Sequence, residues 1–371
     1  MKARDVVIIG GGLAGAAAAT CLAQKGVDVL LLEKEAQPHH KVCGEFLSYE
    51  AQHYLKQLSI DLPSLGSAPI DKMRLIRRDK SASAPLGFQA MSLSRKCLDE
   101  AVLLSAQQAG AEIRRGINVL PPVKEKNHWH IDCHGHDPVS AKAIFLATGK
   151  HDLRGWSQRQ GKQNDYIGFK MHFELTQSQQ TELSGHVEVT LFDGGYAGLE
   201  PVENGKANLC LVVNKSRYVA MGKTWEKLLQ HLMQSTPTLM ARLKDASACW
   251  VKPLSIFGIP YGHVYRPSAN DPAAFFRLGD QMAVIPSLCG DGMAIALHSG
   301  FMAADCYVKT NAVDYHQRLR QQLLGQINRA TMITGMLASP LIQPFVLPVC
   351  QFMPLLMQGF IKQTRLHGPL Y

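Results

Sequence analysis

Apolar and polar positions near the start of the chain follow the pattern of a buried strand, a helix and a second buried strand. Residues 5–9 form a continuous apolar run, glycines follow at 10–12, and an alanine-rich segment of helical length extends over 13–25. A second apolar run occupies residues 27–32. Continuous apolar runs of this length are typical of parallel strands covered on both faces. The beginning of the chain therefore predicts a strand–helix–strand unit.

The same pattern returns later in the chain. Residues 95–108 carry apolar positions at helical spacing, and residues 143–147 form another buried-strand run. Residues 273–306 predict a further strand, a turn and a helix. We expect these segments to join the first unit in one α/β domain.

Between these segments, short apolar stretches alternate with turn residues. Glycine-containing turns at 193–195 and 204–205 predict hairpins. A helix is expected at 225–234. The pattern predicts a mostly antiparallel sheet inserted into the first domain, with strands at residues 167–175, 186–191, 196–201 and 207–213.

These patterns predict two domains and a helical end. The first domain is expected to comprise residues 1–160 and 266–310, and the second to comprise 161–265 with a short contribution from residues near 65–92. The chain has 371 residues, which are ample for two hydrophobic cores. Residues 311–371 are expected to form apolar helices broken at Pro340, Pro344, Pro348 and Pro354.

Composition narrows the functional classes. The net charge of +9 is scattered, without a run of five Lys or Arg, so we expect no nucleic-acid partner. Nine cysteines without a CxxC pair indicate reduced thiols. The first strand follows Met1 too closely for a signal peptide. We expect a cytoplasmic protein, with peripheral contact of the C-terminal segment to the inner face of a membrane as an open alternative.

The first strand–helix turn carries the spacing Gly10-x-Gly12-x-x-Gly15, and Glu33 ends the second strand. The glycines allow a tight turn, a close backbone approach to a pyrophosphate and close helix packing, while Glu33 can accept bonds from ribose hydroxyls. The helix start offers free N–H groups to phosphates. The motif predicts a dinucleotide site, FAD or NAD, with further contacts from Leu13, Ala14 and Lys34.

A second motif lies near residue 280. Asp280 follows a buried strand, where its carboxylate can hold a ribityl hydroxyl, and Gly290-Asp291-Gly292-Met293 opens a helix. N–H groups at that helix start favour negative charge on a reduced flavin. We expect Asp280, Pro286, Gly290, Asp291, Gly292 and Met293 to contact the cofactor.

With both motifs present, the chain resembles the FAD-dependent oxidoreductases that include aromatic-ring hydroxylases, geranylgeranyl reductases and flavin-dependent halogenases. The resemblance covers residues 1–310 and is also carried by Lys41-Val42-Cys43-Gly44-Glu45, the helix from Arg95, and Ala147-Thr148-Gly149. It implies an α/β fold with a Rossmann-like FAD-binding domain of the GR2 type, an inserted antiparallel substrate domain and C-terminal helices. It further implies FAD contacts from Lys41, Cys43, Gly44, Arg95, Thr148 and Gly149.

Two residues are candidates for catalysis. In geranylgeranyl reductases a stretch similar to Lys41–Gly44 lies beside the flavin, so Cys43 is either a thiol activated by a nearby cation or a residue that fills space. Tyr196 begins the stretch 196–201, which related enzymes place on the substrate side of the flavin.

The branch of the family stays open. The 196–201 stretch lacks the tryptophans of halogenases, and it also lacks the second aromatic residue and the lysine of geranylgeranyl reductases. The Asp-Gly motif of aromatic hydroxylases is replaced by Thr148-Gly149-Lys150. No second GxGxxG follows a strand, so we expect transient NAD(P)H binding or a partner reductase as the electron donor. The histidines near Trp129 are expected on an exposed hairpin, and no metal site is predicted.

The leading hypothesis is an FAD-dependent monooxygenase of secondary metabolism that hydroxylates an apolar aromatic or polyketide-like molecule, free or on a carrier protein. No side chain is an obvious general base, so positioning and electrostatics would be the role of the protein. The alternatives are a reductase of C=C bonds in prenyl or lipid-like chains and a non-catalytic flavin-binding redox sensor.

Overall fold

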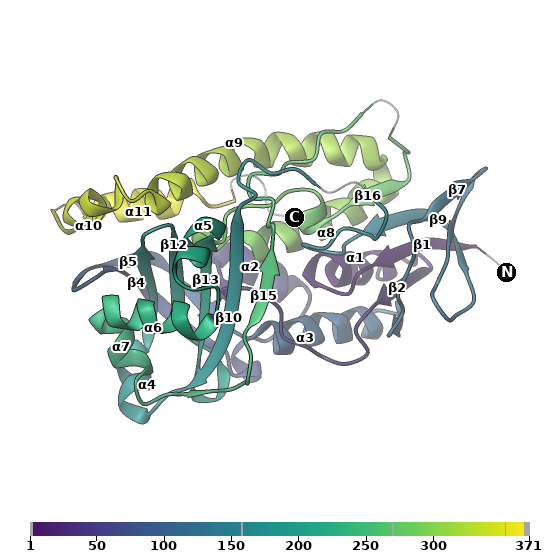
Figure 1. Ribbon diagram of the computed structural model, residues 1–371. Helices are drawn as coiled ribbons and strands as arrows, with labels where there is room; N and C mark the ends of the chain where they lie inside the picture. The colour runs from purple at the N-terminus through teal and green to yellow at the C-terminus, as the bar shows by residue number, and fades with distance from the viewer. Residues whose placement is uncertain (1–2, 157–158, 269–270, 353, 367–371) are drawn as a thin grey trace.

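The computed structural model describes residues 3–156, 159–268, 271–352 and 354–366. The chain forms two sheets, and the long helix α9 (Ala312–Ala338) contacts strands of both (Figure 1). The predicted α/β architecture, with a parallel sheet and an inserted antiparallel one, is confirmed.

The first sheet has the order β6-β2-β1-β9-β8-β7, with β16 also paired to β9. Five strands run parallel, and β7 and β8 form an antiparallel hairpin at the edge. The central residues of β1, β2 and β9 are fully buried, as the continuous apolar runs require. The strands are β1 (Arg4–Ile9), β2 (Val29–Glu33), β6 (Glu112–Arg115), β7 (Val123–Glu125), β8 (His128–Ile131), β9 (Val139–Leu146) and β16 (Phe275–Arg277).

Helices α1 (Leu13–Ala23), α3 (Arg95–Gln108) and α8 (Gly292–Lys309) pack together against one face of this sheet. Helix α1 consists mainly of small residues and packs closely on α8. A Cβ added to Gly300 of α8 would lie 2.5 Å from the Ala14 carbonyl oxygen, so the crossing admits only glycine there. Close packing of α1 fixes the position of the turn that precedes it.

The second sheet has the order β14-β10-β13-β12-β11-β4-β5-β3, with β15 also paired to β10. Its neighbours are antiparallel except for β11 and β4, which run parallel. The strands are β3 (Phe46–Leu47), β4 (Ala68–Arg77), β5 (Lys80–Ser92), β10 (Tyr166–Glu174), β11 (Gly185–Phe192), β12 (Gly195–Pro201), β13 (Lys206–Asn214), β14 (Ser247–Ala248) and β15 (Leu254–Phe257).

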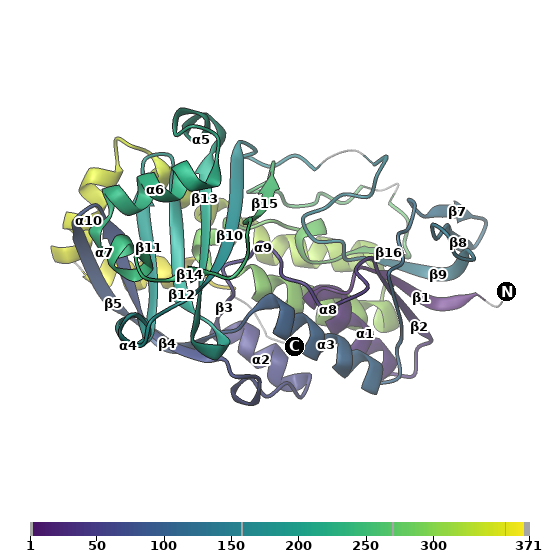
Figure 2. The same cartoon turned by 60° about the horizontal axis from the view of Figure 1, so that its bottom comes forward.

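Short helices cover the outer face of this sheet, and the other face is turned toward α9 and α10 (Figure 2). Trp225, Leu228 and Leu232 of α6 pack on β10, β12 and β13 in an apolar core separate from that of the first domain. The helices here are α4 (Gln177–Leu183), α5 (Lys215–Ala220), α6 (Trp225–Ser235) and α7 (Pro237–Leu243), while α2 (Tyr49–Gln57) packs on α8.

The C-terminal helices α10 (Gln343–Phe352) and α11 (Pro354–Gln363) pack on β5. The expected helix break at Pro348 is wrong, because Pro348 lies inside α10. Within the described residues no single helix is long and apolar enough to cross a membrane, although α9 and α10 together reach that length across a bend of 105°. Large apolar side chains remain exposed around α10, among them Leu341 (82%) and Phe345 (69%).

Candidate active site

A cavity of about 720 Å³ lies between the two sheets. One wall comes from the turn after β1, the end of β2 and residues 147–154 and 278–293. The other wall comes from β11, β12, β15 and residues 361–365 at the end of α11. Its size and its lining, apolar with a few convergent polar groups, are those of a cofactor and substrate site.

The first glycine motif forms one end of this cavity. Gly10 has φ +110°, and a Cβ there would lie 2.4 Å from the Ala147 carbonyl oxygen, so only glycine fits between β1 and β9. A Cβ on Gly15 would lie 2.0 Å from the Gly10 carbonyl oxygen, so Gly15 serves helix packing and does not line the cavity. Gly12, Leu13 and Ala14 do line it.

Two cations stand beside the open face of Gly12. Lys41 Nζ lies 2.8 Å from Asp99 and Arg95 Nε lies 2.7 Å from the same carboxylate. Burial alone would raise the pKa of Asp99, but Arg95 and Lys41 hold it at about 2. One carboxylate therefore orients two cations, and the net positive charge suits a pyrophosphate.

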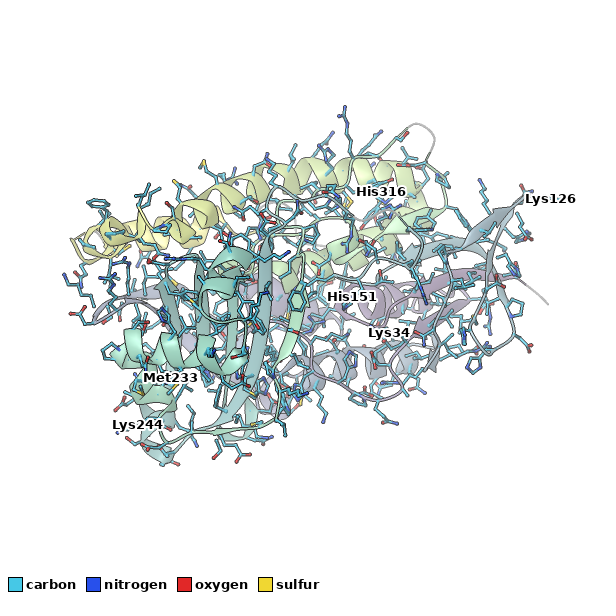
Figure 3. All side chains as sticks on the ribbon, in the orientation of Figure 1. Lys34, Lys126, His151, Met233, Lys244 and His316 are labelled. Atoms are coloured by element: carbon cyan, nitrogen blue, oxygen red, sulfur yellow. The ribbon has the colours of Figure 1, made fainter. Side chains whose placement is uncertain are left out.

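The carboxylate of Glu33 accepts the N–H of Gly11 at 2.6 Å and that of Glu35 at 3.0 Å. It thus ties the end of β2 to the glycine turn, and it lines the cavity. Lys34 and His151 also line this end, and Figure 3 shows both on the first domain. The arrangement is compatible with the ribose role that the sequence predicts for Glu33.

At the second motif, Asp280, Gly290, Gly292 and Met293 line the cavity together with Thr148 and Gly149. Pro286 and Asp291 do not line it, and their contacts with the cofactor stay a prediction. The Asp291 side chain is fully buried on the other side of the turn. Its carboxylate accepts from Ser48 Oγ at 3.2 Å and from Gln326 Nε2 at 2.7 Å. Burial raises the pKa of Asp291 to about 6.

The segment that carries Lys41, Cys43 and Gly44 is clamped by the second sheet. Asn208 Nδ2 donates to the carbonyl oxygens of Cys43 and Gly44 at 3.1 and 2.9 Å. Behind them, Glu45 forms a fully buried ion pair with Lys170, and His172 Nε2 lies 2.7 Å from its other oxygen. Burial alone would raise the pKa of Glu45, but Lys170 and His172 outweigh it and lower the pKa.

Replacing Lys170 with Met is expected to lower the free energy of unfolding by about 3–5 kcal/mol, because it removes one partner from a buried pair. Lys206→Met is the matched control on neighbouring strand β13, since its 3.9 Å pair with Glu174 is largely exposed and should contribute less than about 1 kcal/mol. Urea denaturation measures both. Equal losses of unfolding free energy in the two variants would contradict a stabilising role of the buried Glu45–Lys170 pair.

His40, Glu45 and His172 place three ligand atoms within 4.8 Å of one another, close enough for a metal ion. The Glu45 carboxylate already accepts from Lys170, His172 and the Arg95 N–H. The group is therefore an ion-pair network in which a metal would have to displace Lys170. The histidines predicted on a hairpin include His128 and His130, which lie on β8, and His130 contacts Asp132.

The wall opposite the glycine motifs is formed by β12 and β13. Tyr196, Gly198 and Glu200 alternate along β12 and share the cavity face, with Cys210 of β13 beside them. The Tyr196 hydroxyl contacts Ser287 Oγ at 2.6 Å and accepts the Leu288 N–H at 3.1 Å. Tyr196 therefore positions the turn before α8. Cys43, the other catalytic candidate, lies in the segment that Asn208 holds.

Glu200 is a candidate functional residue that the sequence patterns did not single out. It is 3% exposed, lines the cavity, and its Oε1 has no hydrogen-bond partner in the described part of the chain. Burial, and then the neighbouring Glu45 carboxylate, raise the pKa of Glu200 well above its usual value. Burial therefore favours the protonated, uncharged form of this side chain. Strand alternation from Tyr196 was the signal that could have found it.

The parallel sheet, the glycine turn with its paired cations and the adjoining cavity define an FAD-dependent oxidoreductase. Residues 5–56 match the family described as FAD dependent oxidoreductase. Gly12 leaves room that a Cβ would fill, and Lys41 and Arg95 supply the charge, so the residues present fit FAD. This match agrees with the resemblance to FAD-dependent oxidoreductases that the sequence predicted.

The relatives belong to different branches. The chain is 25% identical to a tryptophan 2-halogenase of Chondromyces crocatus over 81% of its own length and 60% of that protein. It is 24% identical to digeranylgeranylglycerophospholipid reductase 2 of Methanopyrus kandleri, over 81% of the chain and 76% of that protein. The flavin-dependent brominase Bmp2 has the same fold, with a TM-score of 0.82, 19% identity and coverage of 98% and 93%.

Proposed function

We propose that the protein reduces a C=C bond in an apolar substrate, with FAD as cofactor and with electrons from NAD(P)H or a partner reductase. The observation that carries the proposal is Glu200, a buried acid on the cavity wall whose Oε1 has no hydrogen-bond partner among the described residues and whose pKa is raised by burial. Relatives named as reductases of isoprenoid lipids are consistent with this chemistry.

Saturation of a C=C bond needs a hydride on one carbon and a proton on the other. FAD, held by the residues of the glycine turn and reduced by a donor, would supply the hydride. Glu200 gives the proton from its carboxyl to the second carbon and recovers one from solvent. Lys41 and Arg95 hold the cofactor phosphates, and Asn208 holds the Cys43–Gly44 backbone against the cavity. The buried walls exclude water from the reacting atoms.

Glu200 changes the order of the hypotheses that the sequence favours. Hydroxylation of an aromatic ring calls for a dry pocket and profits from a base that ionises the substrate, whereas the raised pKa of Glu200 makes it a proton donor. A redox sensor has no use for such an acid. The reductase therefore becomes the leading hypothesis, ahead of the monooxygenase.

The test is an anaerobic reaction of the FAD-loaded protein with NADPH, or with dithionite where NADPH does not bleach the flavin, followed by a polyprenyl or polyene substrate. Reoxidation of the flavin together with a product heavier by two hydrogens is the expected result. Substrate turnover only in air, with one oxygen atom gained, would replace the reductase by the monooxygenase. If no substrate reoxidises the reduced flavin, the redox sensor remains as the hypothesis.

We also propose peripheral contact with a phospholipid bilayer through the exposed apolar residues around α10. Leu341 and Phe345 are exposed beside α11, whose end lines the cavity, so an apolar substrate has a short path from lipid. A double change to Asp at both positions should reduce co-sedimentation with phosphatidylcholine–phosphatidylglycerol vesicles several-fold. Val251→Asp, at a position 95% exposed elsewhere, is the control and should have no effect.

A further inference from the structure

The end of α11 brings a buried cation to the cavity. Arg365 is 7% exposed and lines the cavity together with Ile361 and Thr364. It lies outside both glycine motifs and outside the buried ion-pair network of Glu45. The guanidinium of arginine stays charged at any working pH, so its burial calls for a partner.

The described residues do not satisfy Arg365. Its Nε and Nη1 are buried without a hydrogen-bond acceptor in the ranges that the structure describes. The nearest carboxylate oxygen is Asp291 Oδ1, at 3.5 Å from Nη1, and Asp291 already accepts from Ser48 and Gln326. A buried donor left without an acceptor costs about 1–3 kcal/mol. Asp291 thus offsets the charge of Arg365 but leaves donor positions open.

Two aromatic rings hold the guanidinium in place. Its central carbon lies 5.4 Å from the ring centre of Phe46 and 4.8 Å from that of Phe88. Cation–π contacts of this kind orient the planar group without using its N–H donors. The rings therefore do not occupy the N–H donors, whose fork matches a carboxylate.

The cavity beside Arg365 is apolar. Phe46, Phe88 and Ile361 belong to one hydrophobic cluster, and cavity-lining residues of that cluster and its surroundings are Met73, Leu86 and Val187. A ligand that fills this part of the cavity needs an apolar body, and its charged end would meet Arg365.

We infer that the substrate is an apolar acid whose carboxylate pairs with Arg365. The inference rests on the proposed function, since it places the acid in the same cavity as Glu200 and the cofactor. Arg365 is then a specificity-determining residue that selects acids over neutral molecules of the same shape and fixes which carbon atoms reach the reacting end.

Calorimetric titration of the FAD-loaded protein, oxidised and without an electron donor, tests the inference. The probes are oleate and cinnamate, each against its methyl ester. At least one acid should bind about tenfold or more tightly than its ester. Arg365→Gln should remove that preference, and Arg365→Lys should restore only part of it, because Lys lacks the fork. Lys362→Gln, which removes an exposed charge of α11 one turn away, should keep the preference.

Failure of this inference is separate from failure of the proposed function. Esters that bind as well as acids in the unmodified protein would overturn the role of Arg365, even if a neutral alkene is reduced. The same holds if Arg365→Gln lowers FAD affinity or changes the flavin potential and leaves the acid preference intact. An Arg365-dependent acid that binds but is never reduced would keep this inference and refute the reductase.

Discussion

Gly12→Val is expected to yield a folded protein that binds FAD at least about 100-fold more weakly, a loss of about 2.7 kcal/mol. The added Cβ would stand 3.7 Å from Lys41 Nζ and 3.8 Å from Arg95 Nη2, between the two cations that face the pyrophosphate. The backbone at Gly12 has φ −74° and ψ −179°, which valine adopts without strain. The side chain therefore takes the place of the phosphates and leaves the fold intact.

Fluorescence titration of FAD into the apoprotein measures this effect, and circular dichroism verifies folding. Gln24→Val is the matched control, because it puts the same side chain on the exposed end of the same helix. Full flavin content in the Gly12 variant would show that the cofactor binds elsewhere.

Glu200→Gln is expected to slow substrate reduction by about 10²–10⁴-fold while the flavin is still reduced at the original rate. Glutamine keeps the size and polarity of the side chain but has no acidic proton. The active form of Glu200 is the protonated one, so the rate in the unmodified protein should be constant below the raised pKa and fall as pH rises through it. In the variant this fall should disappear from the residual activity.

Stopped-flow measurement of flavin reoxidation by substrate, across the pH range, separates this step from reduction. Glu174→Gln, at a largely exposed carboxylate at the end of β10, should keep both the rate and its pH dependence. An unchanged rate in the Glu200 variant would mean that the proton comes from elsewhere.

Much of the fold follows from local patterns in the sequence. The helix predicted for residues 95–108 is α3, and the four strands predicted between 167 and 213 are β10 to β13 within two residues at each end. These elements have strong periodicity and clear turn residues, so local signals suffice. Pro348 is a false signal of a helix break, since α10 continues through it and packs on β5.

The site was predictable where a motif is local and hidden where contacts are distant in sequence. Gly10, Gly12 and Asp280 line the cavity. They could be predicted because strand ends and helix starts have local sequence signals. The pairing of Glu45 with Lys170 joins positions 125 residues apart, and no local pattern encodes it. The direction of the Asp291 side chain likewise depends on Ser48 and Gln326, which come from two other helical regions.

The path of the chain between the sheets has a consequence for how such a protein diversifies. Strands β1 and β2 lie in the first sheet, β3 to β5 in the second, β6 to β9 in the first again, β10 to β15 in the second, and β16 returns to the first. No contiguous stretch therefore holds the complete substrate wall. Recombination that exchanges one block of sequence would separate parts of that wall, so new specificities should arise by point substitution at positions such as 198 and 365.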